Sequence, residues 1–591
     1  MIEETEKLRS PPEVQQFGPP WLTVETGFYL LLVLLGALLR FNALGRQPLQ
    51  EKEAQLALDV WRFYRGGAAS IRGHSPLLFH GNALLYLLFG ANDFVARVLP
   101  ALAGTLLIAL PYPLRPYLGR SGALISAAIL AFSPSFVFFS RQLGGEIIVS
   151  ACALALLAGI LGYTGRAKDS SLWLLAGALA IALLAGGGSY VTLLALGGFF
   201  LALWVRAGLK PASKRQTLLT GGFETRPSRH AWLVAAGIFA ALVLAFSTGL
   251  FVNLHGLQAT LDLLPAWLSQ FQPLADSQPW HYYLSLLLTY ESLVLIFGLA
   301  GACYLARRDL FSALLVCWFG VSLLLYSLMG TKPPSGLLQI LVPLTLLAGR
   351  TLGELLGKVG KGKRWLWDRL ALLIAMPAIL HMLLQLSAFA DPEDPGEPSH
   401  LILVFMSLLF LLCVILITGT LALDWRGALR TGGLVTLLFL GSLMVQATWR
   451  LNYYRPGNPL ELLVERPTSP DVRNLARAIE DFSNQQERDR HSVDITVQGQ
   501  EDPLLAWYLR DFTDLAFLSG SPSSLTPVVI VPIGEPLALP EYRGARFRIQ
   551  SSWQPEDMPG HDLASWFLFR EALAPPTHRD VVMWVALEPE E

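Results

Sequence analysis

Long apolar runs dominate this sequence and limit the folds that are open to it. A helix needs about 20 apolar residues to cross the hydrocarbon core of a bilayer. Thirteen segments meet this length, at 22–41, 94–113, 121–139, 146–163, 171–187, 189–206, 231–252, 282–305, 310–329, 335–356, 369–390, 400–422 and 429–448. Only 15% of the 591 residues are charged, against about 25% in soluble domains. The sequence therefore predicts a mainly α-helical, polytopic membrane protein.

Basic residues are distributed unevenly among the loops between these runs. With a cytoplasmic N-terminus, most Lys and Arg of the loops fall on the inside, at 112–120, 164–170, 206–230, 306–309, 357–369 and 423–430. The short loops on the other side hold almost only Arg141 and Lys332. Because cytoplasmic loops carry the excess of positive charge, this pattern supports both the count and the orientation. It predicts a multi-pass protein of the cell membrane whose first long loop, 42–93, is extracytoplasmic.

The odd number of spans divides the chain into three parts. Residues 1–21 form a cytoplasmic N-terminal segment, 22–448 a transmembrane domain, and 449–591 an extracytoplasmic tail. The tail has the pattern of a small α/β domain. Helices are expected at 469–484 and 503–512, and strands at 493–498, 514–518, 526–533, 546–551 and 581–587. The net charge of −1 excludes an electrostatic nucleic-acid binder.

The first outer loop begins with a charged cluster, Glu51-Lys52-Glu53, directly before an amphipathic stretch. Residues 50–65 place Leu56, Ala57, Val60, Trp61 and Tyr64 on one helical face, which suits a helix in the membrane interface. The two acids would then lie at the helix N-terminus, where the dipole favours negative charge. The cluster can simply cap a surface helix. A functional interpretation draws on the next outer loop, which returns Arg141 and Glu146 to the same face.

Several segments resemble the polytopic GT-C type glycosyltransferases, the class of protein O-mannosyltransferases and aminoarabinose lipid A transferases. The closest pattern is that of a prokaryotic branch of flippase-activity-associated proteins. The segments that carry the resemblance are LQEKEAQLA, WRFYRG, HSP (74–76), FGANDFVARVLPALAG, SRQLGGE, QPWHYYLSLLLTYESLVLIFGLAG (278–301), GTKPPSGLLQILVPLTLLAG (330–349) and PLLAWYLRDF (503–512). They keep the family's order over most of the chain.

The resemblance implies a sugar donor on a polyprenyl phosphate and transfer, with inversion, to an acceptor on the outer face. It also implies an acidic base in the first outer loop. The family's Asp-Glu pair falls on Lys52 and Glu53, and its second acid on Glu146. Lysine cannot accept a proton while it is charged, and its ordinary pKa is about 10.4. The predicted catalytic acids are therefore Glu53, Glu51 and Glu146.

Other polar residues are candidates for substrate binding. Four cations can hold the donor phosphate or extend to lipid headgroups, namely Arg62, Arg97, Arg141 and Lys332. Lys52 lies within the predicted catalytic cluster, and Glu291 lies inside a span, where an ionisable group marks either function or pairing. His74 orders the first loop or contacts the acceptor. Two carboxylates fall short of a metal site, so no cofactor is predicted.

The interpretation that follows is a membrane glycosyltransferase. Its partners would be a polyprenyl-phosphate sugar donor, membrane lipids and a glycan, lipid or protein acceptor. The alternative is a catalytically impaired homologue that assists lipid-linked sugar translocation or envelope glycan assembly, for which Lys52 is the main reason. A secondary transporter is disfavoured, since paired inverted halves are not apparent.

Overall fold

The computed structural model describes most of the chain. The described residues are 23–67, 70–166, 168–208, 228–274, 277–357, 365–389, 398–421, 425–518, 526–533, 542–553, 566, 570 and 575–586. The predicted N-terminal segment 1–21 lies outside them, as do several of the basic residues assigned to cytoplasmic loops.

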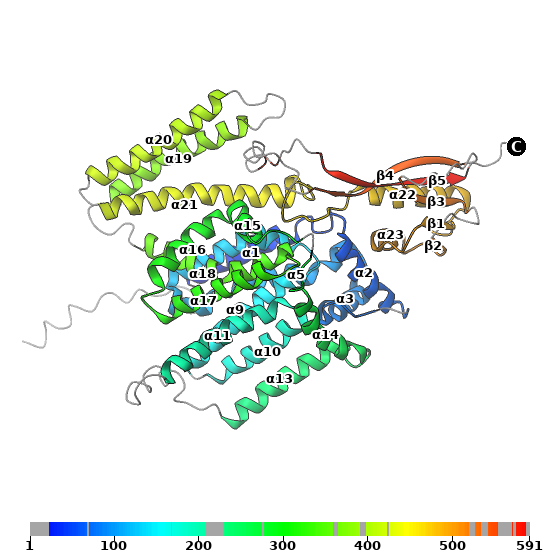
Figure 1. Ribbon diagram of the computed structural model, residues 1–591, viewed down its shortest axis with the longest axis horizontal. Helices are drawn as coiled ribbons and strands as arrows, with labels where there is room; N and C mark the ends of the chain where they lie inside the picture. The colour runs from blue at the N-terminus through cyan, green and yellow to red at the C-terminus, as the bar shows by residue number, and fades with distance from the viewer. Residues whose placement is uncertain are drawn as a thin grey trace, which may run out of the picture.

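A bundle of apolar helices forms the larger part of the molecule (Figure 1). Among the described residues, nine helical segments are long and apolar enough to cross a membrane. They contain α1 (Val24–Phe41), α5 (Val98–Leu107) with η1 (Tyr112–Leu114) and α6 (Arg115–Leu118), α9 (Glu146–Arg166), α11 (Gly188–Gly208), α13 (Arg229–Thr248), α17 (Leu310–Leu328), α18 (Leu337–Leu356) with η2 (Pro334–Gly336), α20 (Pro398–Leu421) and α21 (Trp425–Trp449) with η3 (Arg450–Tyr454).

Two further predicted spans are bent helix pairs. α7 (Arg120–Phe132) and α8 (Pro134–Ser140) meet at 56°, and α15 (Tyr282–Tyr290) and α16 (Ser292–Leu305) meet at 109°. Pro134 explains the first bend, because proline lacks the N–H that would continue the helix. α10 (Asp169–Ala185) and α19 (Trp365–Phe389) have shorter apolar stretches, Asp169–Ala185 and Leu370–Gln385. With these two helices, each of the thirteen predicted spans corresponds to a helix or a bent pair.

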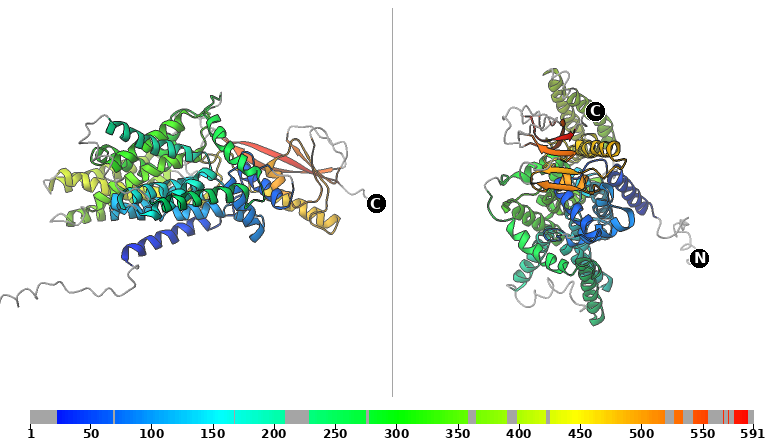
Figure 2. Two further views of the ribbon diagram at one scale, coloured as in Figure 1. Left: turned by 90° about the horizontal axis from the view of Figure 1, so that it is seen from below. Right: turned by 90° about the vertical axis from the view of Figure 1, so that its right-hand side faces the viewer.

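Burial varies strongly across the bundle. α18 is almost entirely enclosed and packs against α7, α16 and α17. α1 lies at the margin of the bundle, as Figure 2 shows in dark blue, and much of its apolar surface is exposed. Exposed leucines on a polytopic helix bundle indicate the surface that faces lipid rather than a defect of packing.

Helices α2 (Glu51–Tyr64), α3 (Pro76–Phe89) and α14 (His255–Ser269) lie with the tail at one end of the bundle (Figure 1). The short helix α4 (Asp93–Ala96) packs against α3. The buried face of α2, with Leu56, Ala57 and Val60, packs against α3 and against the tail helix α23 (Pro503–Tyr508). The apolar stripe predicted to lie in the membrane interface is thus largely occupied by protein.

The tail is a small α/β domain, as predicted. Its five-stranded sheet has the order β2-β1-β3-β5-β4, with β1 parallel to β2 and β3, and β5 antiparallel to β3 and β4. The strands are β1 (Ile495–Gln498), β2 (Leu515–Leu518), β3 (Val528–Pro532), β4 (Tyr542–Ser552) and β5 (Thr577–Ala586). Helix α22 (Asp471–Gln486) presents buried Val472, Leu475 and Ile479 to the core. The predicted fold class is confirmed.

Candidate active site

A cavity of about 210 Å³ lies where the start of α2 and the turn before α9 meet the tail. Its walls come from the start of α2, the turn between α8 and α9, the segment before α18, and the chain that leads into the tail. Its ionisable lining residues are Lys52, Glu53, Glu146 and Glu465. Three of these four were predicted from the sequence, and the cavity brings them together.

Glu53 is held by four donors. Arg97 donates from Nε to Oε1 (3.0 Å) and from Nη2 to Oε2 (2.6 Å). The Leu143 N–H also donates to Oε1, at 2.5 Å, and the Gln50 N–H donates to Oε2, at 2.8 Å. Only 5% of the Glu53 side chain is exposed. This carboxylate therefore joins the start of α2 to the turn before α9, and the Gln50 bond is part of a capping box at the α2 N-terminus.

The other members of the charged cluster contact the tail. Lys52 Nζ lies 3.0 Å from Glu465 Oε2, in a pair whose side chains are 83% and 45% exposed. Glu51 Oε2 accepts a hydrogen bond from Gln550 Nε2 on β4, at 3.2 Å. Glu51 does not line the cavity. The cluster therefore contacts the tail through two of its residues and the bundle through the third.

Glu146 begins α9 and is enclosed by two other segments. Gln339 on α18 donates from Nε2 to Glu146 Oε2 at 3.4 Å. Gly188, the first residue of α11, lies so close that a Cβ there would be 2.2 Å from Oε2. The carboxylate thus lies at the N-termini of two helices, its own and α11, where both dipoles favour negative charge.

Two of the predicted phosphate-binding arginines are bonded to backbone carbonyls. Arg97 donates to the carbonyls of Leu44, Gln47 and Pro48 in addition to Glu53. Arg141 donates to four carbonyls of residues 39–43 at the end of α1, where a cation complements the helix dipole. Both lie near the cavity and line a smaller neighbouring pocket of about 60 Å³.

Lys332 differs from these arginines. Its Nζ donates to Ser277 Oγ at 3.0 Å, and partial burial lowers the pKa of its ammonium group. It directly precedes Pro333, Pro334 and Ser335, which form part of the cavity wall. Among the described residues, Lys332 and Arg62 each have one side-chain partner, fewer than Arg97 and Arg141, and the partner of Lys332 is a neutral hydroxyl.

The last three predicted residues also lie outside the cavity lining. Arg62 pairs with Glu501 of the tail. His74 Nε2 lies 2.8 Å from Asp59 Oδ2, which orders the first loop. Glu291 lies at the bend between α15 and α16, where Oε1 accepts from the Ser133 hydroxyl (2.5 Å) and the Ser135 N–H (3.1 Å). Glu291 therefore joins the bend between α15 and α16 to the bend between α7 and α8.

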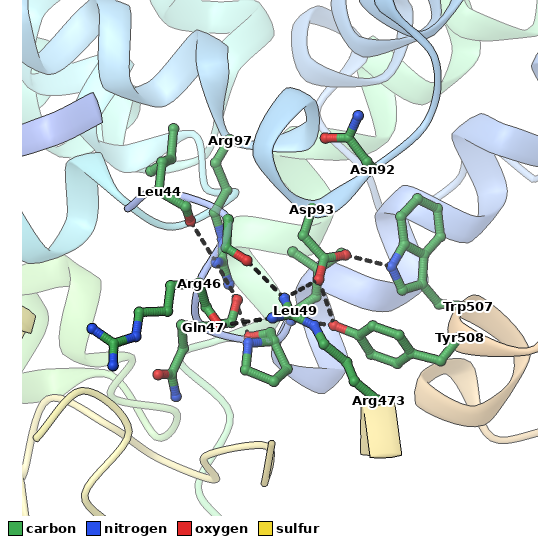
Figure 3. A network of polar contacts seen from close by, with 12 residues as sticks. Leu44, Arg46, Gln47, Leu49, Asn92, Asp93, Arg97, Arg473, Trp507 and Tyr508 are labelled. Carbon is green, nitrogen blue, oxygen red and sulfur yellow. Dashed lines mark hydrogen bonds and ion pairs between the residues drawn. The ribbon is translucent and has the colours of Figure 1, made fainter. Parts of the chain in front are cut away.

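Asp93 at the start of α4 is the centre of a second polar network (Figure 3). It accepts from Trp507 Nε1 (2.8 Å), from the Tyr508 hydroxyl (2.9 Å) and from Arg473, all in the tail. The Tyr508 oxygen in turn accepts from the Leu49 N–H at 2.8 Å. Leu49 immediately precedes the N-cap of α2. The tail therefore fixes the backbone that carries the charged cluster.

Across the described ranges, no group of three or more His, Cys, Asp or Glu side chains is close enough to hold a metal ion. Both carboxylate oxygens of Glu53 already accept hydrogen bonds from Arg97.

Comparisons with known proteins relate this geometry to a fold. The model of the dolichyl-phosphate-mannose-protein mannosyltransferase family matches residues 73–220. The crystal structure of ArnT from Cupriavidus metallidurans bound to undecaprenyl phosphate aligns with 94% of this chain and 98% of its own, with a TM-score of 0.55 and 14% identity. Its apo state aligns with 95% and 98%, with a TM-score of 0.50 and 14% identity. The chain has the GT-C glycosyltransferase fold.

A curated relative adds sequence similarity to this GT-C fold. Over 140 residues the chain is 33% identical to the undecaprenyl phosphate-alpha-4-amino-4-deoxy-L-arabinose arabinosyl transferase 1 of Pseudomonas fluorescens. The match covers 22% of this chain and 24% of the relative, so the chain spans about a quarter of that protein's length. The resemblance to GT-C type membrane glycosyltransferases that the sequence motifs indicated is confirmed.

Sequence reasoning missed Glu465 and the Asp93 network. Glu465 lies between Val464 and Arg466 in an irregular segment with no motif or periodic pattern. Asp93 and Trp507 were both within segments quoted for the family resemblance, so that resemblance was the available signal. Their contact joins residues 414 positions apart in the chain.

Proposed function

We propose that this chain is a membrane glycosyltransferase that moves a sugar from a polyprenyl-phosphate-linked donor to an acceptor on the extracytoplasmic face. The observation that carries the proposal is the cavity that joins Glu53, Glu146 and Lys52 at the tail end of an ArnT-like bundle. A site there adjoins the bilayer, from which a lipid-linked donor arrives, and the aqueous side, where an acceptor is available.

The carboxylate of Glu146 suits the donor side of this site. It lies in the wall formed by the helical bundle, and its charge is favoured by two helix N-termini. As the bond from the sugar to the phosphate breaks, positive charge develops on the sugar ring. A fixed anion beside the ring stabilises that charge without reorganising during the reaction.

The ammonium group of Lys332 is suited to bind the phosphate as it leaves the sugar. An ammonium group is a compact point charge that binds phosphate well. Partial burial lowers the pKa of the Lys332 ammonium group. Because Lys332 stands beside the Pro333–Ser335 wall, its charge can neutralise the polyprenyl phosphate as it leaves.

The proposal is tested with the purified full-length protein and a panel of radiolabelled undecaprenyl-phosphate sugars. Release of labelled sugar is measured with water as the minimal acceptor and with a membrane extract as a source of natural acceptors. Glu146→Gln should lower turnover by about 10²- to 10³-fold, the usual cost of losing one electrostatic group at the reacting centre. The matched control is Glu480→Gln on α22, remote from the cavity, which should keep the wild-type rate.

The rival function is that of an impaired homologue that assists lipid-linked sugar translocation. Two observations favour it. Lys52 has an ammonium group, paired with Glu465, in place of a carboxylate, and both oxygens of Glu53 already accept hydrogen bonds, so neither side chain can act as a base. Binding of undecaprenyl phosphate without turnover of any donor in the panel would support the rival and refute the enzyme.

A further inference from the structure

Three carboxylates line the cavity, and each uses its oxygens differently. A general base must approach to about 3 Å from the proton that it removes, and it needs a lone pair directed at the acceptor. The contacts of Glu53, Glu146 and Glu465 can be compared on these two requirements. The assignment of a base rests on the proposed function, because the base would activate the acceptor of that reaction.

Glu53 fails the second requirement. Each of its oxygens already accepts two hydrogen bonds, from Arg97 and from a backbone N–H. Protonating this carboxylate would leave the buried Arg97 guanidinium without its counter-charge, which is strongly unfavourable. Glu53 is therefore a positioning residue that joins α2 to the turn before α9.

Glu146 fails the first requirement for an acceptor that arrives from the aqueous side. Its carboxylate is enclosed by Gln339 and by the close approach of Gly188. It belongs to the bundle wall of the cavity, away from the exposed residues of the tail wall. Its position suits stabilisation of the positive charge that develops on the donor sugar.

Glu465 meets both requirements. Its side chain is 45% exposed, so an acceptor from the aqueous side can reach it. Oε2 contacts Lys52 Nζ at 3.0 Å, and within the described residues Oε1 makes no hydrogen bond. Exposed ion pairs of this kind are weak and open readily. The carboxylate therefore lines the cavity with Oε1 available to an acceptor.

We propose that Glu465 of the tail is the catalytic base of this site, with Lys52 as the residue that positions it. The acceptor hydroxyl gives its proton to Glu465 while its oxygen forms a bond to the anomeric carbon of the sugar. The bond from that carbon to the phosphate oxygen breaks, and the polyprenyl phosphate leaves with the electron pair. The protonated Glu465 then returns its proton to solvent, to which it is exposed.

This assignment also accounts for Lys52. The resemblance expects an aspartate at that position, and a lysine there has no basic lone pair at neutral pH. Its ammonium instead attracts a carboxylate from a segment 413 residues away. The acid missing from the first outer loop is thereby supplied by the tail.

The test compares Glu465→Gln with Glu501→Gln in the full-length protein. Glu501 is a matched control, because it is also a tail glutamate with 45% side-chain exposure that pairs with a cation of α2, but its partner is Arg62, outside the cavity. Turnover is followed as a function of pH with radiolabelled undecaprenyl-phosphate sugars, and affinity is measured separately with undecaprenyl phosphate. Glu465→Asp, which keeps the carboxylate, and thermal unfolding of each variant check that the fold persists.

Glu465→Gln should lower kcat by about 10²- to 10⁴-fold, the usual contribution of a general base. Its affinity for undecaprenyl phosphate should stay unchanged, and its kcat should vary less with pH than that of the wild type. Glu501→Gln should behave as wild type. A Glu465→Gln variant that keeps most of the wild-type rate, or a Glu501→Gln variant that loses as much, overturns the assignment and leaves the proposed function standing. A wild type that turns over no donor refutes both.

Discussion

At the scale of single residues, the three charged residues that begin α2 make separate contacts. Glu53 and Arg97 were predicted independently, one as a catalytic acid and one as a phosphate ligand, and they form one buried ion pair. Periodicity and motifs indicate which residues are unusual, but they do not indicate which of them meet. A pair that is 44 residues apart in sequence can be recognised only once the fold brings α2 and the start of α5 together.

The Glu53–Arg97 pair leads to a prediction about stability. Removing one partner of a buried ion pair leaves the other charge without compensation, at a cost of about 3–5 kcal/mol. Glu53→Gln and Arg97→Gln should each lower the free energy of unfolding by this order, measured by denaturant unfolding in detergent. The double variant Glu53→Gln/Arg97→Gln should lose less than the sum of the two. Additive losses from the two single variants would contradict the coupling that the geometry implies.

At the scale of elements, close helix packing positions Glu146. Helix α9 begins at the cavity, and Gly188 allows the N-terminus of α11 to approach the Glu146 carboxylate. The sequence predicted both helices from their apolar length, because a run of about 20 apolar residues is a strong signal. It did not predict the approach of their N-termini, which depends on a glycine whose role is visible only in the packed structure.

Gly188→Ala should therefore disturb the site. The added Cβ would lie 2.2 Å from Glu146 Oε2, so the carboxylate must move. Misplacing a reacting group by about 1 Å can cost about 10²-fold in rate, and we expect a loss of this order in donor turnover. Gly198→Ala on the same helix is the control, since nothing lies within 4 Å of its added Cβ. Equal rates for the two variants would contradict the proposed role of Glu146.

At the scale of the whole molecule, the tail and the membrane domain share one site. The tail contacts residue 49 through Tyr508, residue 51 through Gln550 and residue 52 through Glu465. The sequence predicted the first long loop and the tail on the same side of the membrane from the odd number of spans. It could not predict their contacts. The apolar periodicity of the tail's strands and helices identifies the residues of its own core, but it does not identify the residues that contact the loop.

Because the tail contacts residues 49, 51 and 52, a small change in the tail should change the stability of the backbone around the start of α2. Tyr508→Phe removes the acceptor of the Leu49 N–H and one donor to Asp93. An unpaired polar group in a protein interior costs about 1–3 kcal/mol, so the start of α2 should open more often. Hydrogen–deuterium exchange of the peptide around residues 44–53 should become faster, and donor turnover should fall. Tyr542→Phe is the matched control, because its hydroxyl donates to Thr526 within the tail, at 2.9 Å. If both variants left exchange in residues 44–53 unchanged, the tail would be a neighbour of the site rather than a part of it.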